Sequence, residues 1–215
     1  TTPLGDGVHQ FTTTLTDAVG NESPQSAALP LTVDTAAPAA PTGVTVTDDV
    51  APVTGAIAAN GASNDNKPTF AGAAGSAEAG STITVMDGAT VLGTAVVAAD
   101  GSWSVTPTTA LADGAHSITT RATDAAGNVS PVSPALALTV DTAAPAAPAA
   151  PTSTAPSTND NTPGIHIGVG LTDTPSLYVD GVKVPATYDP VTGTLTPTTP
   201  LGDGVHQFTT TLTDA

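Results

Sequence analysis

Apolar and polar residues alternate over several short stretches of the chain, which is the pattern of half-buried β-strands. The clearest stretches are 81–85, 91–97, 102–105, 115–123 and 135–140. Asp-Gly pairs, which favour tight turns, follow or precede these stretches at Asp87-Gly88, Asp100-Gly101 and Asp113-Gly114. No stretch carries a helical apolar stripe of useful length. The pattern predicts an all-β structure in which short strands, spaced by roughly ten residues, form a β-sandwich.

One face of the longer strands is expected to be buried, because apolar residues occupy alternate positions. In 115–123 this face comprises His116, Ile118, Thr120 and Ala122, and near the start of the chain it comprises His9, Phe11, Thr13 and Leu15. His9, His116 and His206 follow Asp-Gly turns at the rim of this face. We interpret these histidines as structural residues that hydrogen-bond back to the turn, as a tyrosine does in other sandwiches, and not as metal ligands.

The chain contains internal repeats. The sequence TTPLGDGVHQFTTTLTDA occupies 1–18 and, letter for letter, 198–215, and a weaker copy occupies 108–125. The sequence TVDTAAPAAP occurs at 32–41 and again at 139–148. These spacings predict modules of about 90 and about 107 residues that alternate in a longer array.

The repeats also predict the module boundaries. Residues 1–34 are expected to be the C-terminal strands of one module, 35–141 a complete module, and 142–215 a module without its last strand. The Ala/Pro stretch 143–156 is typical of an extended, fairly stiff linker. We expect 1–34 to complete a module with the C-terminal part of a neighbouring copy, in the same polypeptide or in a second chain.

Composition excludes several classes of function. The chain carries 19 Asp and Glu against 3 Lys and Arg, for a net charge of −16. This charge repels nucleic acid and anionic membrane surfaces, and no apolar run is long enough to insert into a membrane. Cysteine is absent, and no catalytic or nucleotide-binding motif occurs. We therefore expect neither an enzyme nor a protein with a small-molecule substrate.

The segment DGAHSITTRATDAAGNVSPVSPALALTVDTAAP (113–145), preceded by GSWSVTPTTAL, resembles the bacterial Ig-like repeats of giant surface adhesins and biofilm-associated proteins. Many of those proteins are of the RTX type and are secreted by type I systems. The succession of NDN-x-P, AEAGSTITV, DGSWS, TDAAGNVS and VDTAAP extends this resemblance over nearly all of 64–145. The module from 142 onward departs from the pattern, because it has no counterpart of Trp103.

The resemblance implies tandem Ig-like β-sandwich modules arranged head to tail, outside the cell at a bacterial surface. Its implied function is that of a structural extender that projects an adhesive tip or forms a surface filament or biofilm matrix, with neighbouring modules as partners and Ca²⁺ at the junctions. The alternative is an Ig-like adhesion module that binds a glycan or a protein. The scarcity of Tyr, Trp and Arg in the loops disfavours that alternative, and we expect Trp103 to be a packing residue.

Carboxylates recur at equivalent places of the modules, with almost no Lys or Arg to pair with them. In sandwiches stacked head to tail these groups face one another across the junctions, where they repel unless a cation binds them. Ca²⁺, which takes about six to eight oxygen ligands, suits such a site. The candidate ligands are Asp17, Asp34, Asp48, Asp49, Asp65, Glu78, Asp124, Asp141, Asp160, Asp173 and Asp214.

Two junctions are expected. At the first, Asp6 and Asp34 face Glu78 and Asp124, and at the second, Asp65, Asp113 and Asp141 face Asp173 and Asp214. The acids of the Asp-Gly pairs also suit ordinary turns. For Asp48 and Asp49, ligation and a solvated turn both remain open.

Overall fold

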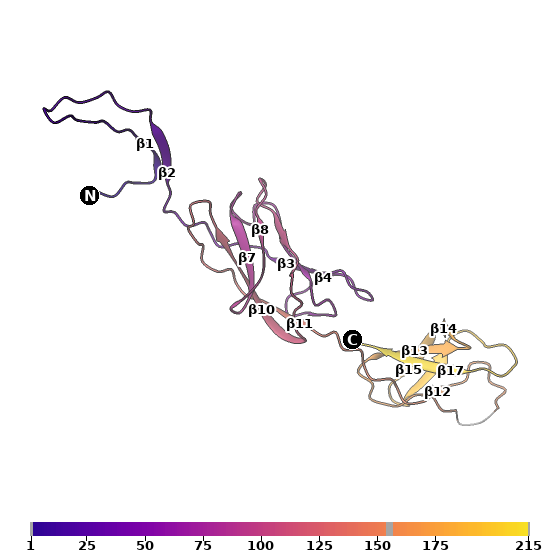
Figure 1. The fold of residues 1–215 in the computed structure, drawn as a ribbon. Coiled ribbons are helices and arrows are strands. Elements are labelled where there is room, and N and C mark those ends of the chain that lie inside the picture. Colours follow the sequence, from indigo (N-terminus) through magenta and orange to yellow (C-terminus); the bar gives the residue numbers. More distant parts are fainter. Residues whose placement is uncertain (1, 154–156, 215) are drawn as a thin grey trace. The chain divides into compact units, whose positions relative to one another are not determined.

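The computed structural model describes residues 2–153 and 157–214, and every regular element in them is a β-strand. The chain forms two compact units, Thr1–Thr142 and Ala143–Ala215 (Figure 1). No helix among the described residues is long and apolar enough to cross a membrane. The structure confirms the predicted all-β fold.

The first unit contains a β-sandwich built from two sheets. One sheet has five strands in the order β5-β11-β10-β7-β8, and the other has four strands in the order β4-β3-β6-β9. The bounds are β3 (Thr45–Asp48), β4 (Gly55–Ile57), β5 (Ala62–Ser63), β6 (Thr69–Gly72), β7 (Thr82–Asp87), β8 (Thr90–Val96), β9 (Trp103–Val105), β10 (Gly114–Thr123) and β11 (Leu136–Val140). All five strands expected from the alternation are present, with ends shifted by one or two residues.

The core of this sandwich comes from alternate residues of its strands. In β10, Ile118, Thr120 and Ala122 are buried, as the alternation predicts. They pack with side chains such as Phe70 and Leu138, which are also fully buried. Pairing of β10 with β11 on one edge and with β7 on the other places this strand in the interior of its sheet.

The second unit contains two smaller sheets, with strand orders β12-β16-β15 and β14-β13-β17. The bounds are β12 (Ile165–His166), β13 (Thr174–Val179), β14 (Val182–Val184), β15 (Ala186–Asp189), β16 (Thr194–Pro197) and β17 (Phe208–Thr213). The turn between β13 and β14 is Asp180-Gly181, with φ of 54° and 81°. Positive φ at both positions is the geometry for which an Asp-Gly pair is favoured in two-residue hairpins.

Strands β1 (Gly7–Phe11) and β2 (Leu29–Val33) form a hairpin with a sheet of its own within the first unit. The predicted burial of its inner face is wrong for the single chain, because Phe11 and Leu15 are exposed. The reason is that, among the described residues, no strand other than β1 and β2 joins this sheet. Alternating apolar and polar residues thus identify the face that a strand can bury. The face is buried only where another sheet covers it.

The predicted linker 143–156 contains no strand in its described part, 143–153. It is not wholly detached, however, because Thr152 forms an isolated antiparallel bridge with His166. Both backbone hydrogen bonds of this bridge measure 3.0 Å between nitrogen and oxygen. Residues 154–156 of the predicted linker lie outside the described residues.

Trp103 is buried in the core of the first unit, which confirms its expected packing role. It lies opposite Gly72 in the pairing of β9 with β6. A Cβ atom at position 72 would overlap the indole Nε1 of Trp103 and the Oγ of Ser76. The indole therefore occupies the space that any larger residue at position 72 would need.

We predict that Gly72→Ala destabilises the first unit by about 1–3 kcal/mol, because a methyl group forced into a packed core displaces its neighbours. Urea unfolding followed by the fluorescence of Trp103, the single tryptophan, measures this change. Gly5→Ala is the control, since a Cβ there meets nothing within 4 Å. Equal stability of the two variants would contradict the packing role.

Candidate functional site

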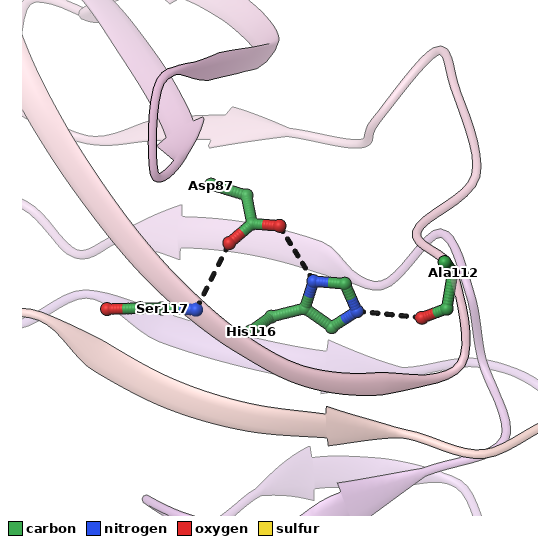
Figure 2. A network of polar contacts seen from close by, with 4 residues as sticks. All are labelled: Asp87, Ala112, His116 and Ser117. Carbon is green, nitrogen blue, oxygen red and sulfur yellow. Dashed lines mark hydrogen bonds and ion pairs between the residues drawn. The ribbon is translucent and has the colours of Figure 1, made fainter.

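His116 links the turn before β10 to the end of β7 (Figure 2). Its Nδ1 lies 2.7 Å from Oδ2 of Asp87, and its Nε2 lies 2.7 Å from the carbonyl oxygen of Ala112. The other carboxylate oxygen of Asp87 accepts a hydrogen bond of 3.1 Å from the backbone N–H of Ser117. The imidazole thus ties three segments of the sandwich together, which confirms that this histidine bonds back to its turn.

These contacts favour the protonated ring. A backbone carbonyl and a carboxylate only accept hydrogen bonds, and the imidazolium is the form in which both ring nitrogens donate. Burial by itself lowers the pKa of His116. The hydrogen bond to Asp87, the bond to the carbonyl of Ala112 and the charge of Asp87 together outweigh burial and raise that pKa above its ordinary value.

The same arrangement occurs in the second unit. His206 Nδ1 lies 2.7 Å from Asp180 Oδ2, and its Nε2 lies 2.9 Å from the carbonyl oxygen of Gly202. The bonds to Gly202 and to Asp180 raise the pKa of His206. In the N-terminal hairpin, His9 Nε2 makes the equivalent contact with the carbonyl of Gly5, at 2.7 Å. Among the described residues, however, His9 forms no ion pair.

We predict that the His116–Asp87 pair stabilises the first unit more at the acidic end than at the basic end of the pH range in which histidine titrates. Because folding raises the pKa of His116, this stability is fully present below the ordinary value of 6.5 and is lost as the pH rises through the folded-state pKa. The test is urea unfolding, followed by Trp103 fluorescence, from about pH 5.5 to about pH 8.5.

Asp87→Asn should flatten this dependence, because it removes the charge that favours the imidazolium. Asp100→Asn is the matched control, since hydrogen bonds from Ser102 lower the pKa of Asp100 and it stays ionised throughout this range. An unchanged pH dependence in Asp87→Asn would contradict the assigned role of the pair.

Asp48 and Asp65 are both buried, and Ser63 joins them. The Ser63 hydroxyl donates to Asp48 Oδ2 at 2.6 Å and accepts from the backbone N–H of Asp65 at 3.0 Å. The other oxygen of Asp48 accepts from the N–H of Val50 at 2.7 Å, and Asp65 Oδ1 accepts from the N–H of Lys67 at 2.7 Å. Each carboxylate therefore accepts a hydrogen bond from the backbone N–H two residues further along the chain. The backbone N–H of Asp49 lies 3.5 Å from Asp65 Oδ2.

We predict that Ser63→Ala destabilises the first unit by about 1–3 kcal/mol, because it leaves a buried carboxylate oxygen of Asp48 without its donor. Ser104→Ala, at an exposed position of β9, is the control for the loss of a serine hydroxyl. Chemical denaturation at neutral pH measures both changes. A destabilisation by Ser63→Ala that is no greater than that of the control would show that the bridge contributes nothing.

Asp17 and Asp124 each cap a loop of the form Asp-x-x-Gly-Asn. Asp124 Oδ1 accepts from the backbone N–H groups of Ala126 at 2.9 Å and Asn128 at 2.8 Å, and its Oδ2 accepts from the side chain of Asn128 at 2.8 Å. The side-chain bond from Asn128 is the main reason that the pKa of Asp124 is lowered. Asn21 plays the same part for Asp17.

Asn128 also connects two candidate ligands that are far apart in the sequence. Besides the bond to Asp124, its side-chain nitrogen donates to the backbone carbonyl of Asp34 at 3.0 Å. The backbone of Asp34 and the carboxylate of Asp124 therefore contact the same side chain, and the predicted first junction stays a prediction. The sequence alone gave no sign that Asn128 would be the connecting residue.

The remaining candidates lie at or near the surface. Asp34, Asp49, Glu78, Asp141, Asp160 and Asp214 are exposed, and Asp173 is half-buried. Asp160 Oδ1 accepts from the N–H of Thr162 at 2.8 Å, which repeats the bond from Lys67 to Asp65. Within the described ranges, no three or more His, Asp or Glu side chains form a group that could hold a metal ion. The second predicted set combines residues of both compact units and stays a prediction.

The sequence did not predict a contact between the turn before β10 and the segment after β11. Asp113, in the turn before β10, accepts hydrogen bonds from the backbone N–H of Thr142 at 3.0 Å and from its hydroxyl at 2.9 Å. Asp6 makes the same two bonds with Thr35, at 3.0 and 2.8 Å. The recurrence of Asp-Gly and of VDT at the same separation was the available signal. The acids of these two turns thus bind the second residue after the next strand.

Comparison with protein families agrees with this architecture. Residues 40–142 match the family model of the bacterial Ig-like domain. That is a non-catalytic module type, and such domains are common in extracellular and surface proteins. A comparison with curated proteins finds no match for the chain.

Proposed function

We propose that the chain is a structural extender repeat of a bacterial cell-surface adhesin, located outside the cell, without enzymatic activity, and with module junctions that Ca²⁺ makes rigid. The observation that carries the proposal is a β-sandwich whose residues 40–142 match the bacterial Ig-like domain, within an internally repeated sequence. Repeated modules that contact only their neighbours build long, thin structures. Such structures suit the projection of an adhesive tip or the formation of a surface filament.

The buried position of Trp103 supports an extender over a ligand-binding module. Aromatic side chains supply much of the binding energy at protein interfaces, and this chain has only 3% aromatic residues. Its single tryptophan lies in the core and cannot stack on a sugar. A surface rich in Thr and Ala, with few charged or aromatic side chains, fits a spacer better than a recognition surface.

Two features support Ca²⁺ as the junction ion. Asp34 and Asp124 both contact Asn128, so a backbone carbonyl oxygen and a carboxylate, which are oxygen ligands of the kind that Ca²⁺ prefers, lie near one another there. In addition, the chain has a net charge of −16, with 3 Lys and Arg against 19 Asp and Glu. Carboxylates at a junction thus gain little from the protein's own cations.

The proposed mechanism depends on the Ca²⁺ concentration. Without the ion, repulsion among carboxylates keeps the junctions between modules flexible, which suits a chain that must be secreted. In the Ca²⁺-rich medium outside the cell, ion binding locks the junctions, and the binding free energy adds to the stability of the folded array.

We predict that Ca²⁺ raises the melting temperature of the chain relative to EDTA, and that Asp34→Ala and Asp141→Ala each reduce this increase. Both variants should leave the melting temperature in EDTA close to that of the parent, because the two carboxylates are exposed. Calorimetric titration with Ca²⁺ gives an independent measure of the ion bound.

Asp100→Ala is the matched control, because it removes an acid from a turn that was not assigned to a junction. An equal Ca²⁺ effect in all variants would contradict the junction sites. A parent chain that neither binds Ca²⁺ nor gains stability from it would overturn the role of the ion while leaving the extender function in place.

A further inference from the structure

The turn before β10 binds the point at which the chain leaves the five-stranded sheet. Asp113, in this turn, accepts hydrogen bonds from the backbone N–H and the hydroxyl of Thr142, at 3.0 and 2.9 Å. Thr142 is the second residue after β11, which ends at Val140, and the Ala/Pro-rich stretch 143–153 follows it. The position of Thr142 therefore depends on the position of this turn.

His116 contacts the same turn. Its Nε2 lies 2.7 Å from the carbonyl oxygen of Ala112, the residue directly before Asp113, and its Nδ1 lies 2.7 Å from Oδ2 of Asp87 at the end of β7 (Figure 2). The imidazole thus connects the turn to β7. A continuous series of contacts leads from Asp87 through His116 and the turn to Thr142.

The histidine contact and the aspartate contact also occur together in the N-terminal hairpin. His9 Nε2 lies 2.7 Å from the carbonyl oxygen of Gly5. Asp6 accepts from the N–H and the hydroxyl of Thr35, at 3.0 and 2.8 Å. An Ala/Pro-rich stretch follows the threonine in both cases. The two contacts are therefore a property of the turn sequence Asp-Gly-x-His and not of one loop.

Loss of a proton from His116 removes one of its two donors. A neutral imidazole has one N–H and one lone pair, whereas the carboxylate of Asp87 and the carbonyl of Ala112 both only accept. The charge of Asp87 favours the tautomer with the proton on Nδ1, because this tautomer keeps the charge-assisted hydrogen bond. The lone pair of Nε2 then faces the carbonyl oxygen of Ala112, and the two repel. The turn thus loses its bond to the ring, while β7 keeps its own.

Asp87 is the charged group that acts on this ring. The charged residues of the elements around His116 are Asp65, Lys67, Asp87, Asp113 and Arg121. Lys67 Nζ donates to the carbonyl of Thr108, ahead of the turn. Arg121 lies five residues along β10, on its other face. Strand β11, which places Leu138 opposite His116, has no charged residue. Burial lowers the pKa of His116, but the hydrogen bonds to Asp87 and Ala112 and the charge of Asp87 outweigh burial and raise it.

We propose that His116 is a pH-dependent switch for the exit of the chain from the first sandwich. The protonated ring fixes the turn, so that Asp113 holds Thr142. Loss of the proton loosens the turn and releases Thr142, from which the stretch 143–153 continues. All contacts of the switch lie within the first unit, so it operates without the proposed Ca²⁺ junctions.

The test is hydrogen exchange of the Thr142 amide in the whole chain. NMR measures it in EDTA from about pH 5.5 to about pH 8.5, corrected for the intrinsic pH dependence of exchange, and the ring signals of His116 report its titration in the same samples. We expect the protection of the Thr142 amide to fall about three- to tenfold as the pH rises, because one hydrogen bond to the turn is lost. The midpoint of this fall should coincide with the titration of His116.

The neighbouring amide of Asp141 is the internal control. Its N–H donates to the carbonyl oxygen of Ser63 on β5, at 2.9 Å, and not to the turn. Its protection should fall much less than that of Thr142. Equal falls at the two amides would mean that the whole sandwich is destabilised and would overturn a local release. Protection of Thr142 that does not change with pH would also overturn it.

Two substitutions and a matched control complete the test. His116→Gln has no titrating ring, so the pH dependence at Thr142 should disappear. Asp113→Ala should lower the protection of Thr142 at every pH and likewise abolish its pH dependence. His206→Gln, which removes the corresponding histidine of the second unit, should leave the behaviour of Thr142 unchanged. A pH dependence that persists in His116→Gln or in Asp113→Ala, or that disappears in His206→Gln, would contradict the switch.

Discussion

A recurring strand segment is buried only where other strands pair with its edges and cover its apolar face. The number of such strands determines how much of each unit is core. Related segments at 1–18, 108–125 and 198–215 contain β1, β10 and β17, which have three different sets of neighbours. Strand β10 has a partner on both edges, and its inner residues are fully buried. Strand β17 has only β13 and is half-buried, and β1 has only β2 and is exposed. Similar alternating segments therefore contribute to the core or to the surface according to the strands beside them.

A second constraint is the near absence of cations. With 3 Lys and Arg for 19 acids, the carboxylates cannot be satisfied by ion pairs. They bond instead to N–H and hydroxyl donors nearby in the sequence, as Asp65 does with Lys67 N–H and Asp124 does with Asn128. The exposed Asp34 follows the same pattern, since its Oδ1 accepts from the backbone N–H of Ala36 at 3.0 Å.

Much of the fold was predictable from local pattern. Alternation located β10 and its buried face, and the Asp-Gly pairs located the turns, because strand pleat and turn geometry depend on neighbouring residues. Four short strands, β3 to β6, escaped prediction since Ala, Gly and Thr carry a weak apolar signal. Contacts between distant residues also escaped it. Asp87 lies 29 residues from His116, and only the register of β7 against β10 brings the two together.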